Sequence, residues 1–114
     1  MNTKTNLKPA EKVMIKKIVG LVSDQTYIPI KDILGKSRCA DFVDARHICY
    51  YFAYKQMKLP VTAIARHFNV THGAVIHALR NMGYRLILNE ANQLRRLMDN
   101  VAEELECGEL MKEV

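Results

Sequence analysis

The sequence predicts an all-α protein, a compact bundle of about five to six helices that contains a helix-turn-helix. Apolar residues recur at three- and four-residue spacing along almost the whole chain, which is the period of amphipathic helices. Proline, glycine and good N-cap residues separate these segments. With 114 residues, 49% of them hydrophobic, we expect a single domain over residues 1–114 with a core of its own.

The first expected helix spans residues 8–23 and lies within a basic N-terminal segment, residues 1–26. Its apolar stripe is displaced from a lysine stripe, which predicts one buried side and one solvated, basic side. The apolar stripe consists of Met14, Ile18, Leu21 and Val22, and the basic stripe of Lys8, Lys12 and Lys16.

A short second helix is expected at residues 30–34. Pro29 disfavours helix in the residue before it, so residues 26–29 form a connection, and Gly35 is a good helix end. The loop that follows carries Arg38.

A long helix beginning near Asp41, its predicted N-cap, and reaching about Met57 is expected to be the central helix of the core. Its apolar positions define one broad face. They are Phe42, Ala45, Ile48, Cys49, Phe52 and Ala53.

Two short helices joined by a tight turn come next and predict the helix-turn-helix, within a core segment that covers residues 30–86. Pro60 fits the first turn of the first helix, and Thr71 is a good N-cap for the second. The apolar positions are Val61, Ile64, Ala65 and Phe68 in the first helix, and Val75, Ile76, Leu79 and Met82 in the second.

The last helix, at about residues 89–106, closes the domain within the segment 87–108. We expect it to end at Gly108 and residues 109–114 to fray. A heptad seam packs either on the same domain or on another chain, as in a homodimer. The seam consists of Ile87, Leu94 and Val101, and of Ala91, Met98 and Leu105.

The charge of the chain is unevenly distributed. Residues 1–86 hold 14 Lys and Arg against 5 Asp and Glu, a net of +9, whereas residues 87–114 hold 3 against 7, a net of −4. A basic surface attracts phosphates, although a solvated basic face has the same composition. No stretch approaches the roughly 20 apolar residues of a membrane span, and the N-terminus is lysine-rich without a secretory core, so we expect a cytoplasmic protein without membrane contact.

Cofactor and enzyme chemistry have little support in the sequence. The cysteines, Cys39, Cys49 and Cys107, form no C-x-x-C pair, and the four histidines have no metal-ligand spacing. No nucleophile–base or carboxylate pair stands out. We therefore expect no metal, no cofactor and no catalytic residue.

The second helix of a helix-turn-helix enters the major groove of DNA, and its N-terminal residues and outer face reach base edges. If its apolar stripe is buried, six residues remain exposed. These candidate DNA-binding residues are Thr71, His72, Gly73, Ala74, His77 and Arg80.

Four sequence blocks carry a resemblance to a known family. They are KDILGKSR at 31–38, DARHICYYFAYK at 44–55, LPVTAIARHF at 59–68 and THGAVIHAL at 71–79. Together they resemble the C-terminal DNA-binding domain of the bacterial replication initiator DnaA, which has D-H-T-T-V-L-H-A at the last block. The resemblance implies a Trp-repressor-like helix-turn-helix that binds double-stranded DNA.

The resemblance implies a role for several residues. Arg38 stands where the family has an arginine that enters the minor groove. Arg46 and His47 match the pair that contacts phosphates at the start of the long helix, and Leu59 and Pro60 match the Leu-Pro of the helix that crosses the backbone.

His72 matches the family's base-reading histidine, and His77 matches the second histidine of that motif. The sequence departs from the family at the positions around His72. Val70 and Thr71 replace its Arg-Asp, and Gly73 and Ala74 replace its Thr-Thr. Most base-edge hydrogen bonds are then missing, so either the target sequence differs or specificity is low.

The sequence therefore predicts a DNA-binding protein that acts in replication initiation, in the control of a mobile element or in transcription. It contains no G-x-x-x-x-G-K-[ST] phosphate loop, the motif of the DnaA ATPase module. The alternative is a protein-interaction or dimerisation module that uses the last helix and retains a vestigial DNA face.

Overall fold

The computed structural model describes residues 7–87 and 92–113, with side chains described at 7–85 and 95–105. Within those ranges the backbone forms six helices and no strand, which confirms the all-α prediction. The helices are α1 (Pro9–Thr26), α2 (Ile30–Ile33), α3 (Ala40–Lys55), α4 (Val61–Phe68), α5 (His72–Ile87) and α6 (Asn92–Glu113).

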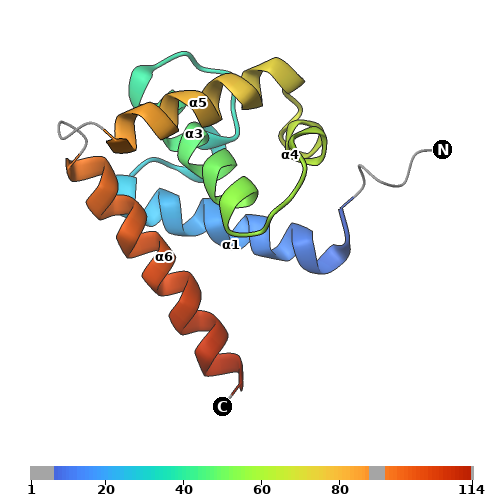
Figure 1. Cartoon of the computed structure of the whole chain (residues 1–114), viewed down its shortest axis with the longest axis vertical. Coiled ribbons are helices and arrows are strands. Elements are labelled where there is room, and N and C mark those ends of the chain that lie inside the picture. Colours follow the sequence, from blue (N-terminus) through green and yellow to red (C-terminus); the bar gives the residue numbers. More distant parts are fainter. Residues whose placement is uncertain (1–6, 88–91, 114) are drawn as a thin grey trace.

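Helix α3 is the central helix, as predicted. It lies between α1 and α5 and also packs against α2 and α4 (Figure 1). The predicted apolar face is buried except for Phe42, which is half-buried, and Tyr50 joins it. Burial raises the pKa of the Cys49 thiol to about 12, so Cys49 behaves as a small apolar core residue.

The start of α3 differs from the prediction. Cys39, rather than Asp41, is the N-cap, and it makes no side-chain cap hydrogen bond. Asp41 lies in the first turn, where its carboxylate is favourably placed against the positive end of the helix dipole. The loop before α3 provides local order instead, because the Cys39 N–H donates to Ser37 Oγ over 3.2 Å.

Helix α1 packs its apolar side against α3 and α6. The Lys8 N–H donates to a Glu11 carboxylate oxygen over 2.8 Å, which satisfies one donor at the helix start. The predicted lysine stripe is exposed, as expected. The buried stripe is rotated from the predicted one, because Met14 and Leu21 are only half-buried. It consists of Ile15, Ile18, Val19 and Val22.

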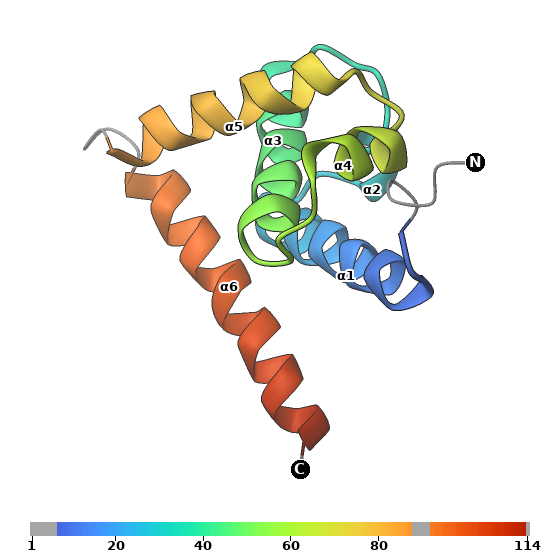
Figure 2. The same cartoon turned by 45° about the vertical axis from the view of Figure 1, so that its right-hand side comes forward.

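Helix α6 packs against α1 through its described seam residues and then extends away from the other helices (Figures 1 and 2). Asn100 on α6 also donates to Gln25 on α1 over 3.3 Å. The predicted helix end at Gly108 is wrong, because α6 continues to Glu113. A single glycine costs a helix about 1 kcal/mol relative to alanine, which the good helix formers around Gly108 offset.

The seam packs on its own domain wherever its side chains are described. Met98, Val101 and Leu105 are all buried. Ile87, Ala91 and Leu94 lie outside the residues with described side chains. No helix of the described chain combines the length and apolar character that crossing a membrane requires.

Candidate nucleic-acid interface

The helix-turn-helix is formed by α4, a three-residue turn and α5. Asn69 takes the left-handed conformation, with φ 56°, and so ends α4; asparagine tolerates this conformation better than most residues. The Val70 N–H donates back to the carbonyl of Ala65 over 2.9 Å, which satisfies an acceptor at the end of α4. Thr71 caps α5 as predicted, since its Oγ1 accepts the Ala74 N–H over 3.1 Å.

Helix α5 buries one side and exposes the other. Val75, Ala78 and Met82 are fully buried and fix its rotation against α3 and α4, whereas Ile76 and Leu79 of the predicted stripe are only half-buried. The prediction missed Ala78, which is also on the buried side. The six candidate residues of this element are all exposed: Thr71, His72, Gly73, Ala74, His77 and Arg80.

The loop that carries Arg38 lies beside the turn of the helix-turn-helix. Figure 2 shows the segment between α2 and α3 running alongside the connection from α4 to α5. The Lys36 ammonium donates to the carbonyl of Asn69 over 2.7 Å and joins the two segments. Arg38 is exposed and follows Lys36 by two residues, so it lies near the turn that precedes α5.

Arg46 organises this loop from within. Its guanidinium donates to three backbone carbonyls, those of Ile33 over 2.6 Å, Ser37 over 3.0 Å and Asp32 over 3.0 Å. The side chain is half-buried. A phosphate contact by Arg46 would therefore compete with three internal hydrogen bonds. In this structure the guanidinium of Arg46 fixes the path of residues 33–37.

His47 is a residue of α3 that faces α5, and its side chain is half-buried. Its ring centroid is 6.4 Å from that of the exposed His77, in an edge-on arrangement. Its Nδ1 is buried and has no hydrogen-bond partner among the described residues. Burial lowers the pKa of His47 below its ordinary 6.5, and the nearby Asp44 opposes that shift in part.

Leu59 and Pro60, the remaining predicted pair, differ in their exposure to solvent. Leu59 is only 4% exposed, so its side chain belongs to the core and is not available to a ligand. Pro60 is exposed and is the N-cap of α4 rather than a residue of its first turn. Of this pair, Pro60 alone stays a candidate for DNA contact.

Sequence reasoning missed Lys36 as a residue of this region. Its partner, Asn69, is 33 residues away in the chain, and a loop lysine that binds a distant carbonyl looks like any other surface lysine in a sequence. No local pattern could have found it.

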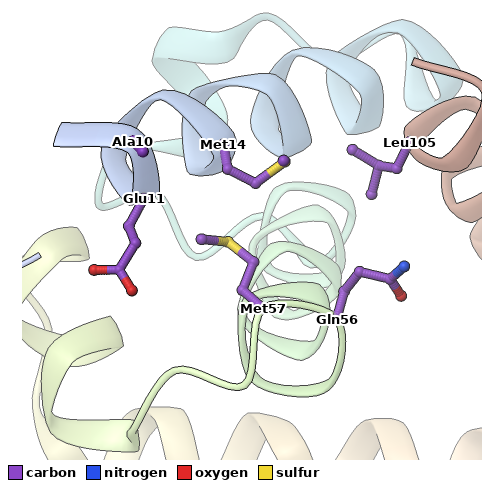
Figure 3. Close-up of a pocket in the computed structure, with 6 residues that line it drawn as sticks. All are labelled: Ala10, Glu11, Met14, Gln56, Met57 and Leu105. Carbon is purple, nitrogen blue, oxygen red and sulfur yellow. The ribbon is translucent and has the colours of Figure 1, made fainter. Parts of the chain in front are cut away.

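A cavity of about 260 Å³ lies elsewhere, between α1, the end of α3 and α6. Figure 3 shows the side chains of Met14 and Met57 extending toward each other across it. The Glu11 carboxylate at its edge already accepts the Lys8 N–H. None of the candidate DNA-binding residues lines this cavity.

The tight turn, the capped second helix with an exposed outer face and the adjoining basic loop define a helix-turn-helix domain of the DNA-binding type. Residues 15–82 match the family model described as the bacterial DnaA protein helix-turn-helix. The chain belongs to this family.

Three relatives place the match in whole proteins. The chain is 38% identical to the chromosomal replication initiator protein DnaA of Leptospira biflexa over 69 residues, 60% of this chain and 16% of that protein. It is 30% identical to the Thermotoga maritima protein of the same name over 80% of this chain and 20% of that protein. A Protochlamydia amoebophila protein, DnaA 1, is 24% identical over 86% and 21%. The chain thus spans only about a sixth to a fifth of the length of these relatives.

Proposed function

We propose that this protein binds double-stranded DNA through its helix-turn-helix, with the start of α5 in the major groove and Arg38 in the adjacent minor groove. The observation that carries the proposal is the joint placement of two exposed elements. The loop that carries Arg38 runs beside the turn before α5 (Figure 2), and the hydrogen bond from Lys36 to Asn69 joins the two. Arg38 and the outer residues at the start of α5 are exposed. A recognition helix beside a basic loop can engage neighbouring grooves at once.

The proposal gives the exposed residues distinct tasks. Thr71 and His72 can hydrogen-bond base edges, and the methyl group of Ala74 can meet a thymine methyl group. Gly73 has no side chain, which lets the backbone approach DNA closely. Packing within the protein does not require this glycine, because a Cβ here would have nothing within 4 Å. In this proposal Pro60, His77 and Arg80 lie on either side of the base-contacting residues, where the DNA phosphates are the groups nearest to them.

Arg46 and His47 take positioning tasks in this proposal. The guanidinium of Arg46 holds the loop that presents Arg38. The ring of His47 packs beside His77 and supports the outer part of α5 from α3. Both residues then act on DNA through their neighbours.

The biological process follows from the relatives only as a proposal. They are named chromosomal replication initiators, which favours a role in replication initiation. Control of a mobile element or of transcription would use the same docking. The family is a helix-turn-helix family, so we propose a non-catalytic task in the bacterial cytoplasm, where the DNA is.

The alternative, an interaction or dimerisation module based on α6, has less support. Such a module needs a free apolar seam, but Met98, Val101 and Leu105 are already buried within the monomer. A homodimer formed through these three residues would have to displace this packing.

Fluorescence anisotropy tests the proposal. Two labelled duplexes, one with a DnaA-type box and one scrambled, are titrated with protein at three salt concentrations. An Arg96→Gln variant, which removes one positive charge from α6, is measured next to the wild type. We expect the logarithm of the binding constant to fall linearly with the logarithm of the salt concentration, with a slope of about −0.9 for each phosphate neutralised. The control variant should show the same slope. No binding to either duplex at low salt would overturn the proposal.

A further inference from the structure

A second basic cluster lies where the start of α1 passes beneath α4, apart from the candidate DNA-binding residues of α5. Lys12 and Lys16 are exposed and one turn apart on α1, and His67 is half-buried on α4. In both views α4 lies over the N-terminal half of α1, whereas α6 lies on the other side of the molecule (Figures 1 and 2).

The imidazole of His67 is partly shielded from solvent. Its ring packs edge-on against Phe68, with 5.1 Å between the centroids, and Phe68 is itself buried. Burial is the main cause that lowers the pKa of His67 below 6.5, and the charges of Lys12 and Lys16 lower the pKa further. Two lysines of α1 therefore act electrostatically on a half-buried side chain of α4.

The cluster has no acidic partner within the described part of the chain. The described ion pair, Arg85 with Asp44 over 3.0 Å, joins α5 to α3. The charges that act on His67 are the positive ones of Lys12 and Lys16. Like charges held close together repel one another, and an anion that binds between them removes that repulsion.

The position of the cluster beside α4 indicates which anion binds there. In a helix-turn-helix, the first helix lies across the DNA backbone while the second enters the groove. Helix α4 is that first helix, and Arg66 is exposed in its last turn. Helix α4 also lies over the N-terminal half of α1, which carries Lys12 and Lys16 (Figures 1 and 2). DNA that lies along α4 is therefore directed toward the lysines of α1.

We propose that Lys12, Lys16 and His67 form a second phosphate-binding surface, which holds the DNA backbone beyond the base pairs contacted by α5. This inference rests on the proposed DNA binding. Helix α1 would then lengthen the stretch of DNA that the protein contacts, in addition to packing against α3 and α6.

Duplex length provides the test. One duplex ends at the edges of a DnaA-type box, and two others extend it by about one helical turn on one side or the other. Wild-type protein should bind one of the extended duplexes with a salt slope steeper by about 2 than that of the short duplex, as expected for two further phosphates. The Lys12→Gln/Lys16→Gln variant should lose this increment and bind the short duplex like wild type.

Controls separate this effect from a general loss of charge or fold. Arg96→Gln, on α6, should keep the increment. Both lysines are exposed, so the double variant should melt like wild type. In an NMR titration, the pKa of His67 should rise when the favoured extended duplex is bound and change less with the short one, because phosphates near the imidazole stabilise its charged form.

The outcomes are distinguishable. An unchanged increment in the double variant, or an equal loss on short and extended duplexes, would overturn the second phosphate surface and leave the proposed DNA binding intact. Failure of wild-type protein to bind any of the duplexes at low salt would overturn the proposed DNA binding, and the second surface with it.

Discussion

The ammonium of Lys36 donates to the backbone carbonyl of Asn69 over 2.7 Å, although the two residues are 33 positions apart. Asn69 is the left-handed residue that ends α4 and starts the turn to α5. The hydrogen bond therefore fixes the loop before α3 to the turn of the helix-turn-helix. This link holds the loop that carries Arg38 beside the turn before α5.

The first prediction concerns Arg38, the exposed arginine of this loop. Arg38→Ala should weaken DNA binding by about 1 to 3 kcal/mol and reduce any preference for A·T-rich flanks, because their narrow minor groove attracts arginine. Anisotropy with A·T-rich and G·C-rich flanks around the same box measures both effects. Unchanged affinity and unchanged preference would remove Arg38 from the interface.

Replacement of Arg46 should lower stability more than it changes phosphate contacts. Arg46→Ala removes a donor from the carbonyls of Asp32, Ile33 and Ser37, of which Asp32 keeps the Gly35 N–H over 3.4 Å, so the free energy of unfolding should fall by about 2 kcal/mol. Urea unfolding followed by circular dichroism measures this change. The salt slope of DNA binding, measured where the variant is folded, should stay as in wild type; a slope flatter by about 1 would instead assign Arg46 to a phosphate.

Loss of the Thr71 cap should destabilise α5. Thr71→Ala removes the oxygen that accepts the Ala74 N–H and should lower the free energy of unfolding by about 1 kcal/mol. Thr71→Ser keeps a capping oxygen and should stay within a few tenths of a kcal/mol of wild type. Equal losses in the two variants, measured by urea unfolding, would show that the hydroxyl does not cap the helix in solution.

Stability should also fall as the pH drops below 7. Burial holds the pKa of His47 below 6.5 in the folded protein, so the unfolded chain binds the proton more readily, and stability is lost as the pH falls from about 6.5 through the folded pKa. His67 acts in the same direction. The charged and titratable groups around His47 are Asp44, which raises its pKa, and Arg46, His77 and Arg85, which lower it.

Thermal unfolding at pH 7.5 and pH 5.5 measures this dependence. The wild type should melt lower at pH 5.5, and His47→Gln should reduce the difference between the two temperatures, since glutamine does not titrate. A pH dependence that is the same in His47→Gln and wild type would show that His47 does not contribute to it. The same comparison for His67→Gln measures how much of the pH dependence comes from His67.

The helix order and the exposed face of α5 could be predicted because local signals determine them. Thr71 has the chemistry of an N-cap, and the apolar spacing after it fixes which side of the helix is buried. Gly108 shows the limit of such signals, because a helix continues through a glycine when its neighbours favour helix. The Asp41 prediction failed for a similar reason: an acidic residue suits the first turn as well as the cap.

The contacts within the candidate interface could not be predicted, because they join residues that are distant in the chain. The carbonyls bound by Arg46 lie 9 to 14 residues away from it, and nothing local distinguishes an arginine that binds a carbonyl from one that binds a phosphate. Leu59 is a further case. Its family role suggested a contact residue, whereas the packing of α3 and α4 places it in the core.

The most direct test of the central claim is an NMR titration of ¹⁵N-labelled protein with a duplex that carries a DnaA-type box. If the helix-turn-helix and its tethered loop form the DNA interface, the largest amide shift changes should fall in residues 36–39 and 69–80, with little change in residues 95–105 of α6. Changes confined to α6, or absent from the start of α5, would contradict the account.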